Sequence, residues 1–207
     1  VYKRQVEDQP VSLSDYYHWF ETGGNMSDVE LTQVREAHKF DETALARYMR
    51  DHVEEFTGPL TVKQFEGGQS NPTFQIITPS RTYVLRKQPP GELLPSAHQV
   101  DREYKVMAAL WNTPVPVPKM YCLCEDVSII GTKFYIMEMV EGRLLTETRL
   151  PSCSQSERSA IYLDLARVLA ELHNVEPVTV GLSEFGRPGN YYAVSYTHLT
   201  QPTNREG

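Results

Sequence analysis

Three short strand-like runs joined by tight turns constrain the fold of this chain more than any other feature. The runs cover residues 60–65, 73–77 and 82–85, and they are rich in β-branched and aromatic side chains. Gly67-Gly68 separates the first two runs, and Pro79-Ser80 separates the last two. Two further runs of this kind lie near residues 119–124 and 133–139. The pattern predicts an antiparallel meander within a five-stranded sheet.

Apolar residues fall at helical spacing in three other segments. The first follows Asp41, a typical helix-capping residue, and continues to about residue 56. The second extends from Ser96, which could also act as a cap, to about Trp111, where three nearby prolines end it. The third covers about residues 154–173. An antiparallel sheet combined with these helices predicts an α+β fold.

Charge and composition argue against two classes of partner. A net charge of -7 is unlike that of a general nucleic-acid binder, because phosphate backbones are bound by clustered Lys and Arg. No run of about 18 apolar residues is present to span a membrane.

The cysteines indicate a reducing compartment. Cys122, Cys124 and Cys153 form no C-x-x-C pair, so we expect buried, reduced thiols rather than half of a zinc site. A location in the cytoplasm or an organelle matrix fits best.

The glycine turn could approach a ligand closely. Gly67 and Gly68 allow positive φ angles, while Ser70, Asn71 and Thr73 offer short hydrogen-bonding groups to phosphate oxygens. The turn lacks the Walker lysine pattern and a full G-x-G-x-x-G. By itself it is weak evidence, because most glycine turns of this kind are plain hairpins.

A phosphate site also needs a fixed positive charge from a neighbouring strand, and Arg86 or Lys87 could supply it. Side chains alternate across a strand, so only Arg86 shares a face with Val84, which is placed to lie beside an adenine ring. Glu103 borders the apolar stripe of the following helix, where an acid could pair with the strand cation. Each residue alone would more often be a solvated charge.

The last strand leaves the sheet into a connector that ends at Gly142. Met137, Glu138 and Val140 lie where such a connector can present backbone groups to an adenine edge. Glycine turn, basic strand, acidic helix and connector follow one another in the order in which a kinase-type amino-terminal lobe builds its ATP phosphate site. Together they predict a nucleotide site.

With these motifs in place, residues 38–193 resemble the aminoglycoside phosphotransferase and choline kinase superfamily, closest to the kinase-like domain found fused to acyl-CoA dehydrogenases. The main strings are H-K-F-D at 38–41, G-G-Q-S-N-P-T at 67–73, Y-V-L-R-K-Q-P-P-G at 83–91 and D-R-E-Y at 101–104. V-P-V-P at 115–118, I-G-T at 130–132, Y-I-M-E at 135–138 and F-G-R-P-G-N-Y at 185–191 add to them.

The resemblance implies a two-lobed kinase fold, with an amino-terminal lobe made of a five-stranded antiparallel sheet and an αC-type helix, and the first helices of a carboxy-terminal lobe. It implies that residues 67–73 cover the ATP phosphates, that Arg86 pairs with Glu103, and that Glu138 and Val140 contact adenine through the backbone. Family members use ATP and Mg²⁺ to phosphorylate a small-molecule hydroxyl. The dehydrogenase-linked branch looks suited to hydroxyacyl-CoA substrates, with a fused acyl-CoA dehydrogenase domain as a partner.

The chain departs from the family in its catalytic segments. Family members carry the catalytic Asp in H-G-D-x-x-x-x-N and a metal-binding Asp in a later D-x-D, and neither occurs here. We therefore expect no catalytic residue and no metal ligand in this chain, and no phosphotransferase activity from it alone. Three interpretations stay open: a kinase represented by its nucleotide-binding half, a nucleotide-binding pseudokinase-like domain, or an interaction domain without catalysis.

The two ends look unlike the middle. Residues 1–5 and 194–207 resemble translated sequencing adapters, and Met26 could be the natural start; a native disordered tail is the alternative interpretation. The expected organisation is an irregular leader over 1–37 and a kinase-like amino-terminal lobe over 38–140. The hinge and the start of the carboxy-terminal lobe follow over 141–193, before a tail that looks non-native over 194–207.

Overall fold

The computed structural model describes residues 31–66, 71–91, 98–143, 145 and 147–186. Gly67, Gly68, Ser70, Ser96 and the tail over 194–207 lie outside these described residues. The elements, in chain order, are β1 (Leu31–Thr32), the 3-10 helix η2 (Glu36–His38), α2 (Glu42–His52), β2 (Thr61–Phe65), β3 (Thr73–Ile77), β4 (Thr82–Lys87), α3 (Val100–Leu110), β5 (Met120–Cys124), β6 (Phe134–Glu138) and α4 (Gln155–His173).

The six strands form one antiparallel sheet in the order β1-β2-β3-β4-β6-β5. The predicted meander β2-β3-β4 and the two later strands are confirmed, and so is the α+β fold class. The structure adds β1, a two-residue strand that pairs with the far edge of β2. This strand lies within the stretch 1–37, for which we expected irregular structure.

The core lies between α2 and one face of the sheet. Phe74, Leu85 and Ile136 are paired across β3, β4 and β6, so their side chains share this face, and all three are fully buried. Leu45 and Met49, four residues apart on α2, are buried in the same cluster. Asp41 caps α2 as predicted, because its Oδ1 accepts from the backbone N–H groups of Thr43 (2.8 Å) and Ala44 (3.0 Å).

Two cysteines of β5 belong to this core. Cys122 and Cys124 are buried free thiols, and Cys153 is buried as well. Burial raises the pKa of the Cys122 thiol to about 12. The prediction of buried, unpaired cysteines is therefore confirmed.

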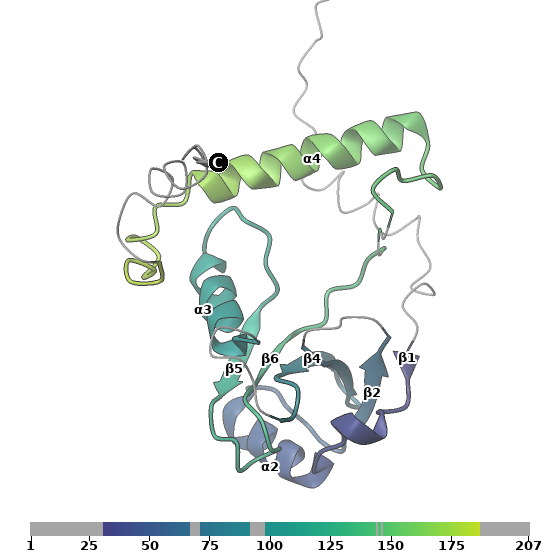
Figure 1. The fold of residues 1–207 in the computed structure, drawn as a ribbon, viewed down its shortest axis with the longest axis vertical. Coiled ribbons are helices and arrows are strands. Elements are labelled where there is room, and N and C mark those ends of the chain that lie inside the picture. Colours follow the sequence, from purple (N-terminus) through teal and green to yellow (C-terminus); the bar gives the residue numbers. More distant parts are fainter. Residues whose placement is uncertain (1–30, 67–70, 92–97, 144, 146, 187–207) are drawn as a thin grey trace, which may run out of the picture.

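Helix α3 packs against β5 and β6 (Figure 1), and its first residue, Val100, is fully buried. Arg102 in its first turn also contacts the segment that follows α4. The Arg102 guanidinium lies 3.9 Å from the centroid of the Phe185 ring and donates from Nη2 to the Phe185 carbonyl oxygen (3.1 Å). These contacts join α3 to a distant part of the chain.

Helix α4 begins at a complete capping box. The Ser154 hydroxyl accepts from the Glu157 N–H, and the Glu157 carboxylate accepts from the Ser154 N–H. The helix runs apart from the sheet (Figure 1), and none of its residues is buried. Leu165 and Leu169, which belong to its predicted apolar stripe, are 60% and 50% exposed. Among the helices of the described regions, none has the length and apolar character needed to cross a bilayer.

Candidate functional site

The candidate site is built on one row of side chains across the sheet. Thr73 of β3 is paired with Arg86 of β4, which in turn is paired with Tyr135 of β6. Because neighbours in a row share a face, all three side chains lie opposite the Phe74, Leu85 and Ile136 face that packs on α2. The row therefore faces the side of the sheet on which α3 lies.

Glu103 of α3 reaches this row and binds two of its members. Its Oε2 accepts from Arg86 Nε (2.9 Å) and from the Tyr135 hydroxyl (2.9 Å). The predicted ion pair between strand and helix is thus present. Its side chains are 29% and 34% exposed, so solvent screens the pair and limits its contribution to stability. The main effect of the Arg86–Glu103 pair is to fix the direction of the guanidinium.

Tyr135 is the neutral donor in this group. The side chain is almost fully buried, and its ring lies 6.2 Å from that of Tyr104 on α3. Burial raises the pKa of the Tyr135 hydroxyl, and the adjacent Glu103 carboxylate raises it further. The hydroxyl therefore keeps its proton at neutral pH and continues to donate to Glu103.

Asn71, at the carboxy-terminal end of the glycine loop (residues 67–73), closes a ring of hydrogen bonds with this pair. Arg86 Nη1 donates to Thr73 Oγ1 (3.2 Å), and that hydroxyl donates to the Asn71 carbonyl (3.2 Å). Asn71 Nδ2 then donates to Glu103 Oε1 (2.9 Å). The ring links the loop end, a strand and a helix, and it engages both oxygens of the carboxylate.

His98 holds the other end of the Asn71 amide. Asn71 Oδ1 can only accept, so His98 Nδ1 is the donor across their 3.0 Å contact. His98 has a φ of 58°, in the left-handed region that few residues other than glycine adopt. Its carbonyl accepts from Gln88 Nε2 (2.9 Å), which ties the residue to the end of β4.

Lys87 points away from this group, as strand alternation predicted. Its side chain is buried, with Nζ 5.7 Å from the centroid of the Phe40 ring, and burial lowers the pKa of its amine. Val84, in contrast, shares the face of Arg86 and is paired with Met137 of β6. Arg86 is therefore the cation of the candidate site.

The connector after β6 begins beside this row. The backbone N–H of Glu138 donates to the Lys119 carbonyl (2.8 Å), and its carboxylate accepts from the Lys119 N–H (3.1 Å). A backbone contact from Glu138 to a ligand would therefore use its carbonyl oxygen. Val140, two residues on, is 64% exposed.

Sequence reasoning missed two members of the site. Tyr135 could have been found from strand register, because it is directly opposite Arg86. His98 carries no such signal, since it lies in an irregular segment between β4 and α3. As for a metal, the described residues hold no group of three or more His, Cys, Asp or Glu side chains that could bind one.

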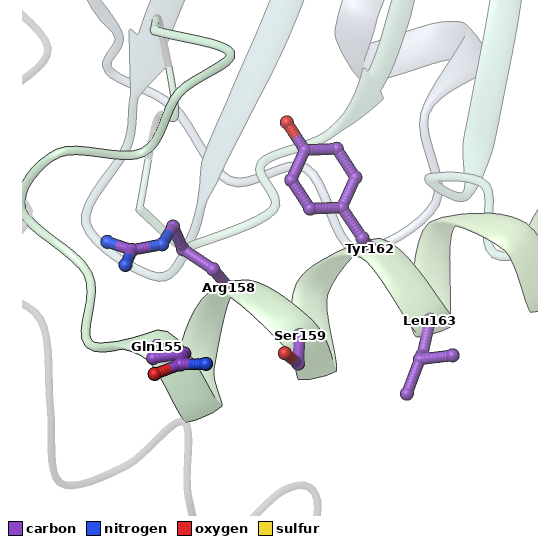
Figure 2. A pocket seen from close by; sticks show the side chains of 5 residues that line it. All are labelled: Gln155, Arg158, Ser159, Tyr162 and Leu163. Carbon is purple, nitrogen blue, oxygen red and sulfur yellow. The ribbon is translucent and has the colours of Figure 1, made fainter.

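A hollow elsewhere on the molecule lies along the first half of α4 (Figure 2). Among the described residues its lining comes from that helix, and Figure 2 shows Arg158 and Tyr162 on the same side of the helix. Both side chains are held by backbone carbonyls of the preceding segment, Arg158 by Cys153 (2.6 Å) and Tyr162 by Thr148. None of the site residues predicted from the sequence lines this hollow, so it is not part of the candidate site.

An antiparallel sheet with a strand arginine fixed by a helix glutamate, next to Asn71 and Thr73, is the arrangement of a kinase-like phosphotransferase lobe. The family model described as "Phosphotransferase enzyme family" (APH) matches residues 61–201. The chain belongs to this family, a family of kinase-type enzymes.

Named relatives agree with this assignment. "Probable acyl-CoA dehydrogenase IBR3" of Arabidopsis thaliana is 49% identical over 177 residues, which cover 82% of this chain and 21% of the relative. "Acyl-CoA dehydrogenase family member 11" of Homo sapiens is 43% identical over 172 residues, covering 81% of this chain and 22% of the relative. The chain thus spans about a fifth of the length of these relatives.

A solved structure is similar over much of the chain. It is a crystal structure from Ralstonia eutropha JMP134 that carries an aminoglycoside phosphotransferase assignment. The two are 50% identical with a TM-score of 0.68, and the match covers 78% of this chain and 46% of the other. The resemblance stated from the sequence motifs is confirmed.

Proposed function

We propose that this chain is the nucleotide-binding part of an ATP-dependent phosphotransferase that phosphorylates a hydroxyl group of a small molecule. The observation that carries the proposal is the Arg86–Glu103 ion pair beside Thr73, at the end of the glycine loop. A phosphoryl group in transfer needs a cation held in a fixed direction, and a strand cation paired with a helix glutamate serves that purpose in kinases.

The donors of Arg86 suit this role. Its guanidinium has five N–H groups, of which one donates to Glu103 and one to Thr73 among the described residues. The remaining donors can bind phosphate oxygens while these two contacts hold the plane of the group. The residues proposed to complete the phosphate contacts are Gly67, Gly68, Ser70 and Thr73, together with the backbone of Asn71.

The adenine would lie further along the same face. Val84 and Met137 are paired there, and we assign them to the apolar contact with the ring. The Glu138 carbonyl and the Val140 N–H would meet its polar edge. This division leaves the Glu138 N–H in its bond to Lys119.

The acceptor is proposed to be a hydroxyacyl-CoA. Support comes from the relatives named as acyl-CoA dehydrogenases, of which this chain matches about a fifth. In a protein of that length, the phosphotransferase domain would be joined to a dehydrogenase domain. A hydroxyl on the acyl chain is the group that both the family chemistry and this association can accommodate.

Mg²⁺ would accompany ATP, yet the described residues do not form a metal site. The sequence also lacks both the H-G-D-x-x-x-x-N and the D-x-D segment. We therefore propose that this chain binds the nucleotide but does not transfer phosphate by itself. We expect a weak metal dependence of its nucleotide affinity, because the described residues offer no group of three or more His, Cys, Asp or Glu side chains to hold the ion.

Titration calorimetry of the purified chain with ATP tests the proposal, since calorimetry needs no turnover. Saturable binding with one site per chain is expected, together with the absence of ATP hydrolysis or phosphate transfer over hours. A chain that binds no nucleotide would contradict the proposal and favour an interaction domain. Measurable turnover would contradict the inactivity.

A further inference from the structure

We propose that Asn71 is a positioning residue that binds the chain just before β3 to Glu103, so that Asn71 and the Arg86 guanidinium are held in their binding geometry together. This inference rests on the proposed nucleotide site, and it changes the role of one residue in it. The side chain of Asn71 would act on the nucleotide through Glu103 and Arg86 and would not touch it.

The burial and bonding of Asn71 carry the argument. Its side chain belongs to a residue that is only 2% exposed, although it lies at the end of a loop. Nδ2 donates to Glu103 Oε1 at 2.9 Å, and Oδ1 accepts from His98 Nδ1 at 3.0 Å. Both ends of the amide are thus used inside the protein, and a buried amide that gave up these bonds would be left unsatisfied.

The backbone of the same residue closes the connection. The Asn71 carbonyl accepts from Thr73 Oγ1, and that hydroxyl in turn accepts from Arg86 Nη1. Arg86 is bound to Glu103, and Glu103 is bound to the Asn71 side chain, so four residues form a closed ring. A shift of Asn71 therefore breaks its contact with Thr73 or with Glu103, the two residues that hold Arg86, and a shift of α3 releases Asn71.

His98 makes the anchor specific. Its left-handed backbone directs the ring to Asn71, while its carbonyl is held by Gln88 Nε2 and by the Val100 N–H (2.9 Å) at the start of α3. An unfavourable backbone conformation persists only where surrounding contacts compensate for it. Asn71 is therefore held between the start of α3 and the carboxylate one turn further along that helix.

An exchange of donor and acceptor tests the contact. Asn71→Asp places a carboxylate against Glu103 Oε1, and we expect ATP affinity to fall by at least about tenfold, because the bond is lost and two like charges meet. In Glu103→Gln alone, the glutamine oxygen stays with Arg86 and Tyr135, so its NH2 group faces the NH2 group of Asn71. Two donors then meet without an acceptor, and ATP binding should weaken as well. In the double variant the glutamine amide can donate to the new carboxylate, while its oxygen still accepts from Arg86 and Tyr135. ATP affinity should return to within about threefold of the unaltered chain, as expected when a pair couples strongly.

Affinity is measured by calorimetry, and thermal midpoints are recorded for every variant. Asn112→Asp, at an exposed position just after α3, makes the same chemical change and should leave ATP affinity unchanged. A double variant that binds ATP no better than Asn71→Asp would overturn the inference, as would an Asn71→Asp variant with normal affinity. If the unaltered chain binds no nucleotide, the proposed function fails instead. The coupling is then judged from the thermal midpoints, where additive shifts of the two single variants would overturn it.

Discussion

At the scale of single residues, the site shows how far strand alternation carries a prediction. A period of two places Arg86 with Val84 and turns Lys87 away, and the structure has both side chains as predicted. The partner Glu103 could be proposed because it borders the apolar stripe of its helix. The Asn71 contacts could not, since they depend on where an irregular segment places the ring of His98.

Removal of the strand cation should affect binding far more than stability. Arg86→Ala is expected to weaken ATP binding by about tenfold or more, the effect of a lost charge-assisted contact. The free energy of unfolding should fall by less than about 1 kcal/mol, because the pair with Glu103 is partly exposed. Calorimetry and denaturant unfolding measure the two effects.

Arg81→Ala serves as the matched control. Arg81 also pairs with a glutamate, Glu55, at 3.0 Å, but it lies at the turn before β4 and its side chain is 43% exposed. Its removal should leave ATP affinity unchanged. Equal losses of affinity in the two variants would refute a specific role for Arg86.

Lys87 predicts a dependence of stability on pH. Burial lowers the pKa of its amine in the folded chain below the ordinary 10.5, so the unfolded chain binds more protons between the two pKa values. The free energy of unfolding therefore rises with pH between these two pKa values. Below them, the buried charge of Lys87 lowers it.

Lys87→Met should remove that cost, because the apolar side chain fills a similar volume. We expect the free energy of unfolding to increase by about 1 kcal/mol at neutral pH, with the gain shrinking as the pH approaches 10.5. Urea unfolding of both chains at several pH values measures it. A gain that stays constant with pH would show that the amine titrates normally.

At the scale of elements, the strands and helices were predictable and two features of their environment were not. β1 has only two residues, too few to show a period, and it forms because the edge of β2 offers pairing partners. The apolar stripe of α4 predicts a packed helix, yet Leu165, Leu169 and Leu172 are exposed. Periodicity reports which face can be covered, whereas coverage depends on what else is present to pack there.

Two helix caps should therefore differ in their effect on the fold. Asp41→Ala removes the cap of α2, which packs on the core, and should lower the free energy of global unfolding by about 1 kcal/mol. Ser154→Ala removes an equivalent bond from α4, which has no buried residue. There we expect loss of helical signal without a shift of the core transition. Far-UV circular dichroism reports helix content and near-UV circular dichroism reports the packing of aromatic side chains, so the two signals, followed together during unfolding, separate the two cases.

At the scale of the whole molecule, the sheet with α2 buries its apolar side chains, whereas α4 leaves apolar side chains exposed. The sheet and α2 enclose a closed core, while α4 presents Tyr162, Leu165, Leu169 and Leu172 along one side. A contiguous apolar stripe on a soluble surface promotes association. The isolated chain is therefore expected to self-associate as its concentration rises.

Leu165→Glu combined with Leu169→Glu should suppress that association, because the new charges interrupt the stripe and repel one another. Sedimentation velocity over a range of concentrations provides the measurement. Ala160→Glu, at an exposed position on the opposite side of α4, adds charge without touching the stripe and should change little. Self-association that persists in the double variant would show that the interface lies elsewhere on the molecule.

Because the thiols of Cys122, Cys124 and Cys153 are buried, their rates of alkylation report how often the structure around each of them opens. An alkylating reagent attacks the thiolate, and here it must wait until the surrounding structure opens. The two thiols of β5 would time the opening of the core, whereas Cys153, next to the cap of α4, would time a more local event. Mass spectrometry of the alkylation at each site would thus give separate opening rates for the two regions, with native cysteines only and no engineered probe.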